Sequence, residues 1–451
     1  MSDFLEKAKA RFDAETTLDL DWRLRKLEAL HSWIRKHEVE IANALEADLS
    51  KSGEESYMTE TGLVLSEISF VRKHLKRWAK RHSVRTPLFL FPAKSFTKRK
   101  PYGPVLILSP WNYPFLLSLE PLVCALAAGN TAVIKPSAKS ENVSKLLCDM
   151  AADLFPDGEV QVAIGDHALA ESLLSEPFQL IFFTGSSKVG VRVLELAAKN
   201  LTPAILELGG KCPCVVDASA NLELSARRLA FGKLVNAGQT CVAPDFACVD
   251  IRVAEQFQNA LVNAFKTFAP EGAQTKNFPK IIDGEHLRRL ENLVRGEKVL
   301  CGGKSFGEKF DPTILVEAGW DSPAMREEIF GPVLPLMVYR SESELHEKLS
   351  RLPRPLAAYV FSGDRRFVRR LQKRLHFGSM TVNDTLMQIS SPYLPFGGVG
   401  TSGMGRYHGE AGFKAFSHEE SFLERGTWID IPFRYPPFSK WKSKLIHFFL
   451  K

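Results

Sequence analysis

The chain has 451 residues, of which 45% are hydrophobic and 25% charged, a composition typical of a globular protein with room for two or more packed units. Its formal charge is +7, but 59 basic residues stand against 52 acidic ones, so the sequence predicts no nucleic-acid partner. No apolar run approaches the ~20 residues of a membrane-spanning helix, and seven cysteines without a CxxC pair favour a reduced, cytoplasmic compartment.

The first half of the chain alternates between helical and strand patterns. Apolar residues recur at three- and four-residue intervals over residues 3–48 and 55–82, which predicts helices. Residues 86–100 predict a hairpin with its turn near Pro92-Ala93-Lys94. Apolar runs typical of buried parallel strands follow at 105–109, 131–136, 160–165 and 179–185. Helical segments separate them at 118–128, 139–154 and 187–199. This rhythm predicts a doubly wound α/β sheet.

A second series of strand patterns follows, without any internal repeat or low-complexity linker, so we expect two units that pack tightly. The predicted strands lie at 204–210, 213–217, 246–251, 356–362 and 379–384. The basic run RRFVRRLQKR at 365–374 places Phe367, Val368 and Leu371 at helical spacing, which favours a solvated helix face over a phosphate-binding site. The 11 histidines include no HExxH, and no metal site is expected.

A glycine turn joins a strand to a helix in QLIFFTGSSKVG. Gly185 and Gly190 are five residues apart, which matches neither GxGxxG nor a P-loop. The N–H groups of a helix N-terminus beside a strand end can still bind a pyrophosphate. A purely structural role for both glycines explains the same pattern.

Two polar residues interrupt buried strands or follow them directly. Asn112 lies between Pro110 and Pro114 after the strand VLILS, so its amide is held and can donate to a developing oxyanion, although this segment alone favours an ordinary turn asparagine. Glu207 lies within the apolar strand AILELGG, where a carboxylate is costly unless its pKa is raised or it is paired. It is therefore either a general base or a structural ion-pair partner.

Cys241 follows the short polar turn GQT. The predicted helix ELSARRLAFGKLV ends at Asn236-Ala237-Gly238, so the thiol lies on a loop between a helix and a strand. A loop thiol is either a packed cysteine or a nucleophile that forms hemithioacetals and thioesters. The polar turn leads us to expect an exposed loop that presents the sulfur.

Several motifs in order resemble those of the aldehyde dehydrogenase superfamily: LSPWNYP, KPS, FTGSSKVG, LELGGK, NAGQTC, EEIFGPV and PFGGVGTSGMGRYHG. The resemblance runs from about residue 5 to residue 437, and the YHG, FSH and RYPP elements look most like the class 3 branch. That branch contains dimeric enzymes that act on aromatic and medium- to long-chain aldehydes. The resemblance implies an α/β fold with a Rossmann-type cofactor domain (1–84 and 101–208), an α/β catalytic domain (209–408) and an oligomerisation element (85–100 and 409–451).

The resemblance also implies a mechanism. Cys241 attacks the aldehyde, Asn112 and the Cys241 backbone N–H hold the oxyanion, hydride passes to NAD or NADP, and Glu207 activates the water that hydrolyses the thioester. The implied cofactor contacts are Trp111 and Ser186 at the pyrophosphate beside the turn of Gly185 and Gly190, Lys135 at the adenine ribose, and Glu328 with Phe330 at the nicotinamide ribose. Phe396 resembles a substrate-pocket aromatic, whereas the residues alone favour a core position.

One position departs from many relatives, in which KPS is followed by Glu. Here the sequence is KPSAKSEN, with Ala138 at that position. Without a carboxylate there, no like charge repels the 2′-phosphate of NADP⁺. We therefore expect NADP⁺ to be accepted.

The C-terminal sequence FSKWKSKLIHFFLK has an apolar run too short to span a bilayer. Trp441, Lys442 and Lys444 fit either a membrane interface or a tail packed on the partner of a homodimer. Two other functions stay open. A CoA-acylating dehydrogenase has no need of Glu207 as a water-activating base, and a non-enzymatic binding or structural protein has no need of Cys241, Glu207 and Asn112 together.

Overall fold

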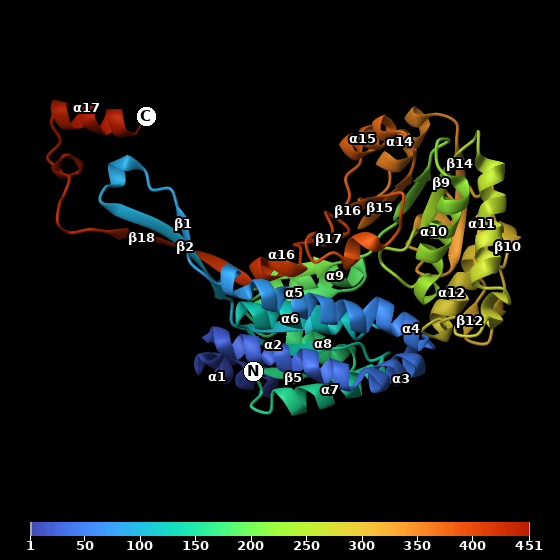
Figure 1. The fold of residues 1–451 in the computed structure, drawn as a ribbon, viewed down its shortest axis with the longest axis horizontal. Helices are drawn as coiled ribbons and strands as arrows, with labels where there is room; N and C mark the ends of the chain where they lie inside the picture. The colour runs from blue at the N-terminus through green and yellow to red at the C-terminus, as the bar shows by residue number, and fades with distance from the viewer. Residues whose placement is uncertain (1, 451) are drawn as a thin grey trace.

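The computed structural model describes residues 2–450, which form two α/β units and a projecting arm (Figure 1). The six-stranded sheet of the first unit has the order β17-β7-β6-β3-β4-β5, and all its strand pairs are parallel except that of β17 with β7. Its strands are β3 (Pro104–Leu108), β4 (Thr131–Lys135), β5 (Val160–Val162), β6 (Leu180–Thr184), β7 (Ala204–Glu207) and β17 (Gly403–Met404). The order from β5 to β7 is that of a doubly wound sheet, and the strand order reverses between β3 and β6.

Helices cover both faces of this sheet. Along β3, Val105 and Ile107 pack into one core and Leu106 and Leu108 into the other, because successive side chains of a strand point to opposite faces. The helices of this unit are α1 (Asp3–Asp13), α2 (Leu20–Lys36), α3 (Glu38–Leu49), α4 (Gly53–Ser56), α5 (Gly62–Trp78), α6 (Leu116–Ala128), α7 (Glu141–Leu154), α8 (His167–Leu174) and α9 (Ser187–Ala198). Strands buried on both faces explain the continuous apolar runs in the sequence.

The second unit is built on a seven-stranded sheet of order β10-β13-β14-β9-β8-β15-β16, in which only β10 is antiparallel to its neighbour. The strands are β8 (Pro213–Val216), β9 (Phe246–Asp250), β10 (Lys298–Cys301), β13 (Thr313–Val316), β14 (Val333–Tyr339), β15 (Ala357–Phe361) and β16 (Ser379–Val382). A separate short hairpin joins β11 (Ser305–Phe306) to β12 (Lys309–Phe310). The helices are α10 (Leu222–Leu234), α11 (Ala254–Phe268), α12 (Gly284–Val294), α13 (Pro323–Arg326), α14 (Glu342–Ser350) and α15 (Arg365–Arg374). The predicted α/β fold class is confirmed.

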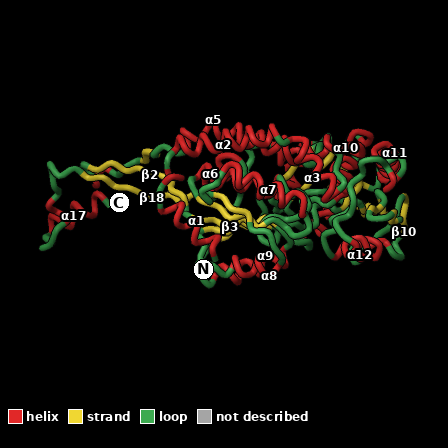
Figure 2. The backbone as a smooth tube through the Cα atoms, turned by 90° about the horizontal axis from the view of Figure 1, so that it is seen from below, coloured by secondary structure: helices red, strands yellow, loops and turns green. Residues whose placement is uncertain are grey.

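The arm is a three-stranded sheet of β1 (His82–Val84), β2 (Ala93–Pro101) and β18 (Ser417–Arg425). It extends away from both units and carries α17 (Lys440–Phe449) near its end, whereas α16 (Gly409–Ala415) lies at its base (Figures 1 and 2). The predicted turn at Pro92-Ala93-Lys94 is wrong, since Ala93 is the first residue of β2 and pairs with Arg425. The hairpin partner of β2 is β1, and its longer pairing is with β18, more than 300 residues away, which local pattern does not reveal.

Three other sequence-based boundaries differ from the structure. The predicted helix over 3–48 is broken, because Glu15 takes a left-handed backbone conformation and Asp19 begins α2 by accepting the N–H groups of Asp21 and Trp22. The predicted helix over 55–82 ends at Trp78, and His82–Val84 joins the arm rather than the first unit. Strand β17, from the range expected for the catalytic domain, completes the first sheet.

Candidate active site

A cleft of about 260 Å³ opens where the strand order of the first sheet reverses, at the carboxyl ends of β3 and β6. The second unit closes its other side. The lining residues are Pro110, Trp111, Asn112, Thr184, Gly185, Ser186, Glu207, Gly209, Cys241, His286, Glu328 and Phe330. Eight residues singled out from the sequence are among them: Trp111, Asn112, Gly185, Ser186, Glu207, Cys241, Glu328 and Phe330.

The GQT turn before Cys241 is buried, which corrects the expectation of an exposed turn, whereas Cys241 itself is partly exposed. Asn236 and Ala237 both take positive φ, of 52° and 50°, so the chain reverses sharply after α10. Gln239 is fully buried, donates to the carbonyls of Asn236 and Lys280, and accepts the N–H of Ile282. The Thr240 hydroxyl hydrogen-bonds that of Tyr113 at 2.5 Å. The polar side chains of the turn therefore fix its backbone from within.

Asn112 is held against this loop. Its side chain is 3% exposed, and its Nδ2 donates to the backbone carbonyl of Gln239 at 3.0 Å. An amide NH2 has two donor hydrogens, so one stays available to a group beside Cys241. The sequence-based argument that the prolines hold this side chain omitted this second anchor.

Glu207 ends β7, is 2% exposed, and neither of its carboxylate oxygens has a hydrogen-bond partner among residues 2–450. Burial raises the pKa of this carboxyl group well above its ordinary value, and Arg406 only partly opposes the rise. This environment excludes the structural ion pair as the reason for a carboxylate in the strand, because no cation contacts it within the described chain. A buried carboxyl group with a raised pKa is suited to proton transfer.

The pKa of the Cys241 thiol is raised to about 12, by burial first and then by the carboxylates of Glu328 and Glu207, while the N–H groups of Cys241 and Val242 oppose the rise. The thiol is therefore protonated at neutral pH. Nucleophilic attack therefore requires that the thiol lose this proton. Glu207 lines the same cleft, and its charge has the second-largest effect on the pKa of the thiol among the carboxylates, after that of Glu328.

Aromatic side chains form the outer wall of the cleft. Trp111 meets Phe330 edge to face at 5.4 Å between ring centroids, and His286 lies 6.0 Å from Trp111. His286 Nε2 lies 2.7 Å from the Phe330 carbonyl, and Arg289 Nε donates to Nδ1, which assigns the proton to Nε2. Burial lowers the pKa of His286 to about 4, so the ring is neutral. Sequence analysis missed His286, because α12 carries no local motif.

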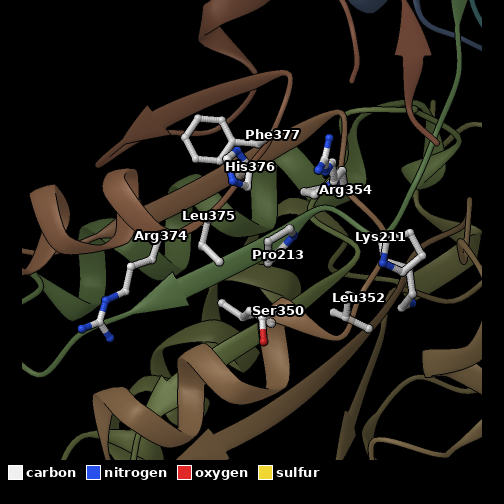
Figure 3. Close-up of a pocket in the computed structure, with 13 residues that line it drawn as sticks. Lys211, Pro213, Ser350, Leu352, Arg354, Arg374, Leu375, His376 and Phe377 are labelled. Atoms are coloured by element: carbon white, nitrogen blue, oxygen red, sulfur yellow. The ribbon is translucent and has the colours of Figure 1, made fainter. Parts of the chain in front are cut away.

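Glu328 lies against Gly209, where a Cβ would come within 2.2 Å of Glu328 Oε2. Burial raises the pKa of Glu328 to about 8, with Asp245 adding to the rise. Lys211 holds the segment that precedes Glu328, because its Nζ donates to the carbonyls of Ala324 and Glu327 and also to Asp245. Figure 3 shows Lys211 at the edge of a neighbouring cavity of about 240 Å³, where Arg354, Arg374 and His376 also lie.

The cleft fits a dinucleotide. Ser186 caps α9 by accepting the Val189 N–H, and the positive end of the helix dipole faces the cleft beside Gly185. The Thr184 hydroxyl is buried without a hydrogen-bond partner among residues 2–450. The absence of a side chain at Gly209 allows the Glu328 carboxylate to lie against the backbone there. Gly190 lies outside the cleft lining, and a Cβ there would come within 2.9 Å of Leu208, so its visible role is close packing of α9 on the sheet.

Lys135 and Ala138 lie beyond the cleft lining. Lys135 Nζ donates to the Pro136 carbonyl at 2.8 Å, and burial lowers its pKa. Ala138 is exposed after β4, and the adjacent Lys139 pairs with Asp283 at 2.5 Å. That pair links the first unit to the N-terminus of α12.

Phe396 also lies outside the cleft lining. Its ring stacks on His408 at 5.2 Å and meets Tyr407 edge to face at 5.8 Å. It is nearly fully buried in the main core cluster, as the residues alone had favoured.

Between residues 2 and 450, no group of three or more His, Cys, Asp or Glu side chains is arranged to hold a metal ion. In the same part of the chain, no helix has both the length and the apolar character needed to cross a bilayer.

Comparisons with known proteins agree with this geometry. The profile of the Aldehyde dehydrogenase family matches residues 1–422. The chain is 41% identical to the 4,4'-diaponeurosporen-aldehyde dehydrogenase of Staphylococcus aureus over 98% of each chain, and 39% identical to the dimeric NADP-preferring aldehyde dehydrogenase of Canis lupus familiaris over 97% of this chain and 98% of the relative. Among solved structures, a substrate-bound Staphylococcus aureus AldH superposes with a TM-score of 0.97 at 41% identity, covering 99% of each chain. An NADP-dependent enzyme of E. coli superposes at 0.87 with 26% identity, covering 94% of this chain and 89% of that one.

Proposed function

This chain belongs to the aldehyde dehydrogenase family and is an NAD(P)-dependent enzyme of aldehyde oxidation, and we propose that Cys241 is its nucleophile. The observation that carries the proposal is the convergence of Cys241, Asn112 and Glu207 on one cleft. The sulfur adds to the aldehyde carbon to give a thiohemiacetal. The thiol is protonated at rest, and it releases its proton to solvent as the carbon–sulfur bond forms, so Glu207 remains free to accept a proton from water in the second half of the reaction.

We propose that Asn112 and the backbone N–H of Cys241 stabilise the oxyanion of the thiohemiacetal. The second hydrogen of Asn112 Nδ2 is available for this bond, since the first binds the Gln239 carbonyl. Donors fixed before the reaction stabilise developing charge without reorganising. The buried hydrogen bonds of the Gln239 turn supply that rigidity.

In the second half of the reaction, Glu207 activates a water molecule that hydrolyses the thioester and releases the carboxylic acid. Burial raises the pKa of its carboxyl group well above the ordinary value, which makes the carboxylate a stronger base toward water. A CoA-acylating enzyme transfers the acyl group to a thiol instead, and does not require this carboxylate. The unpaired, buried Glu207 therefore favours hydrolysis.

For the cofactor we propose that the N-terminus of α9, with Gly185 and Ser186, binds the pyrophosphate, and that Trp111, Glu328 and Phe330 hold the nicotinamide end. When bound, NAD⁺ or NADP⁺ accepts the hydride from the aldehyde carbon. Lys135 and Ala138 are proposed at the adenine ribose, in continuation of the cleft past the end of β4. His286 joins this set as a wall of the nicotinamide end.

An aldehyde panel tests this proposal. NAD(P)H absorbance is recorded without CoA for the wild type, Cys241→Ser and Glu207→Gln, with chain length and aromaticity graded across the panel. We expect turnover in the wild type, loss of turnover in Cys241→Ser, and a preference for aromatic or medium- to long-chain aldehydes. Turnover only with added CoA would assign the acylating reaction. No NAD(P)H formation from any aldehyde would favour a binding or structural role.

We further propose a cytoplasmic homodimer joined through the arm. Strand β18 is an edge strand of the three-stranded sheet, and an unpaired edge is a template for pairing with a second chain. The Canis lupus familiaris relative is named as dimeric. Sedimentation equilibrium of the full chain is expected to give twice the monomer mass. A single chain in solution at micromolar concentration would overturn the proposal.

The C-terminal tail is proposed to contact an anionic membrane surface. Trp441 is 54% exposed, and Lys442 and Lys444 lie on the same short helix. Pelleting with anionic vesicles is expected for the full chain and not for a chain that ends at Pro437. If neither pellets and the shorter chain forms a weaker dimer, the tail packs on the partner subunit instead.

A further inference from the structure

Lys51 is a fully buried lysine that lies behind the Asn112 segment. It stands in the connection between α3 and α4, and 0% of its side chain is exposed. Its Nζ donates to Glu60 Oε1 at 2.6 Å and to the backbone carbonyl of Asn112 at 3.1 Å, and it lies 4.0 Å from the centroid of the Tyr113 ring. Burying an ammonium group is costly unless its partners converge as these do.

Glu60 extends the contact to the start of α6. Its Oε2 accepts the backbone N–H groups of Phe115 at 2.9 Å and Leu116 at 3.1 Å. Lys51 and Glu60 together therefore bind the backbone on both sides of Tyr113. The backbone of the five-residue stretch from 112 to 116 is therefore held at both of its ends.

The same N-terminal segment also holds the turn before Cys241. Asn236 Nδ2 donates at 2.8 Å to the Asn112 carbonyl that Lys51 binds, and Glu55 Oε1 accepts the Asn236 N–H at 2.7 Å. The Asn112 carbonyl thus has two donors, one from each side of the site. Residues 51–60 connect the strand end that bears Asn112 to the turn that leads to Cys241.

We propose that Lys51 is a positioning residue that fixes the Asn112 amide relative to the backbone N–H of Cys241. The inference rests on the oxyanion role proposed above for Asn112. Lys51 is not among the residues that line the cleft, so it acts through Asn112 rather than on the substrate. Loss of its ammonium group leaves the Asn112 carbonyl with Asn236 alone, and the peptide that carries the amide gains rotational freedom.

The test variant is Lys51→Met, which keeps an unbranched side chain against Tyr113 and removes the donor. We expect kcat to fall by roughly 10–100-fold, since a misplaced oxyanion donor loses much of its stabilisation. The Kd for NADP⁺, measured by intrinsic fluorescence titration, should stay within about twofold of the wild type, because the cofactor end is untouched. Lys26→Met is the matched control: Lys26 also donates to a backbone carbonyl, that of Leu154, and lies 5.0 Å from the Phe155 ring, and it is not among the residues that line the cleft.

A double-mutant cycle separates positioning from general damage. In an Asn112→Ala background, Lys51→Met should lower kcat by less than about twofold, because the group that Lys51 positions is already absent. The same loss of kcat in both backgrounds, or wild-type kcat in Lys51→Met, would overturn the inference. Wild-type kcat in Asn112→Ala would instead overturn the proposed oxyanion role. If Lys51→Met does not fold, Glu60→Gln, which releases Lys51 but keeps an acceptor for α6, takes its place in the same cycle.

Discussion

The side-chain amide of Asn112 donates to the main-chain carbonyl of Gln239 at 3.0 Å, two residues before Cys241. This bond joins a strand end of the first unit to the cysteine loop of the second. The proposed nucleophile and the proposed oxyanion donor are therefore placed relative to each other by direct contacts between the units, of which this bond is one. A change that loosens either segment moves one relative to the other.

Replacing Asn112 by Ala removes both the contact with Gln239 and the donor to the oxyanion. We expect kcat to fall by about 10²–10³-fold, the usual effect of losing one oxyanion donor. The alkylation rate of Cys241 by iodoacetamide should change far less, because that reaction develops no oxyanion. A loss of alkylation equal to the loss of kcat would mean that Asn112 acts by holding the thiol.

Glu207→Gln removes the water-activating base. We expect a rapid burst of NAD(P)H followed by very slow turnover, since the thioester forms and is not hydrolysed. Stopped-flow absorbance measures the burst against the number of active sites. If the burst disappears together with turnover, the essential role of Glu207 is to accept the Cys241 proton in the first step.

Ala138→Glu restores a carboxylate at the proposed adenine-ribose site. Its charge repels a 2′-phosphate, and we expect the ratio of kcat/KM for NADP⁺ to that for NAD⁺ to fall by roughly tenfold or more. The ratio of the Kd for NADP⁺ to the Kd for NAD⁺, measured by titration, should rise correspondingly. An unchanged ratio would place the 2′-phosphate away from residue 138.

Glu67 makes stability depend on pH. Burial and the neighbouring Glu120 raise its pKa from 4.5 to about 7, against the opposing effects of His408 and the Gly409 N–H. A raised folded-state pKa gives a contribution that is fully present below the unfolded value of 4.5 and is lost as pH rises through about 7.

From about pH 5.5 to about pH 8.5, the free energy of unfolding of the wild type should therefore fall by about 2 kcal/mol more than that of Glu67→Gln. Urea unfolding at the two pH values measures the difference, and the exposed Glu46→Gln on α3 serves as the control. Equal pH dependence in Glu67→Gln and the wild type would contradict the assignment of this effect to Glu67.

Local patterns predicted the strands and the loops that end them. Asn112 and Glu207 were singled out because each is a polar residue at the end of a buried strand, and the structure gathers both in one cleft with Cys241. The predicted exposure of the GQT turn is wrong for a physical reason. Its polar side chains hydrogen-bond to buried backbone groups, such as the Asn236 and Lys280 carbonyls, rather than to water.

Contacts between distant segments were not predictable. His286 reaches the cleft only because α12 packs beside the Phe330 turn, and its own helix reads as an ordinary surface helix. Lys51 lies 61 residues before Asn112, and nothing in its local sequence indicates burial. The pairing of β2 with β18 was likewise not predictable from local patterns, because β18 comes after all the strands of the two larger sheets in the chain.

Mass spectrometry of the trapped intermediate tests the central claim most directly. Glu207→Gln is incubated with an aldehyde and NADP⁺, quenched in acid and digested, with Cys241→Ser in the same background as the control. The account predicts an acyl group on the peptide that contains Cys241, and none in the control. An acyl group on another of the seven cysteines, or NADPH formation with no acylated peptide, would contradict it.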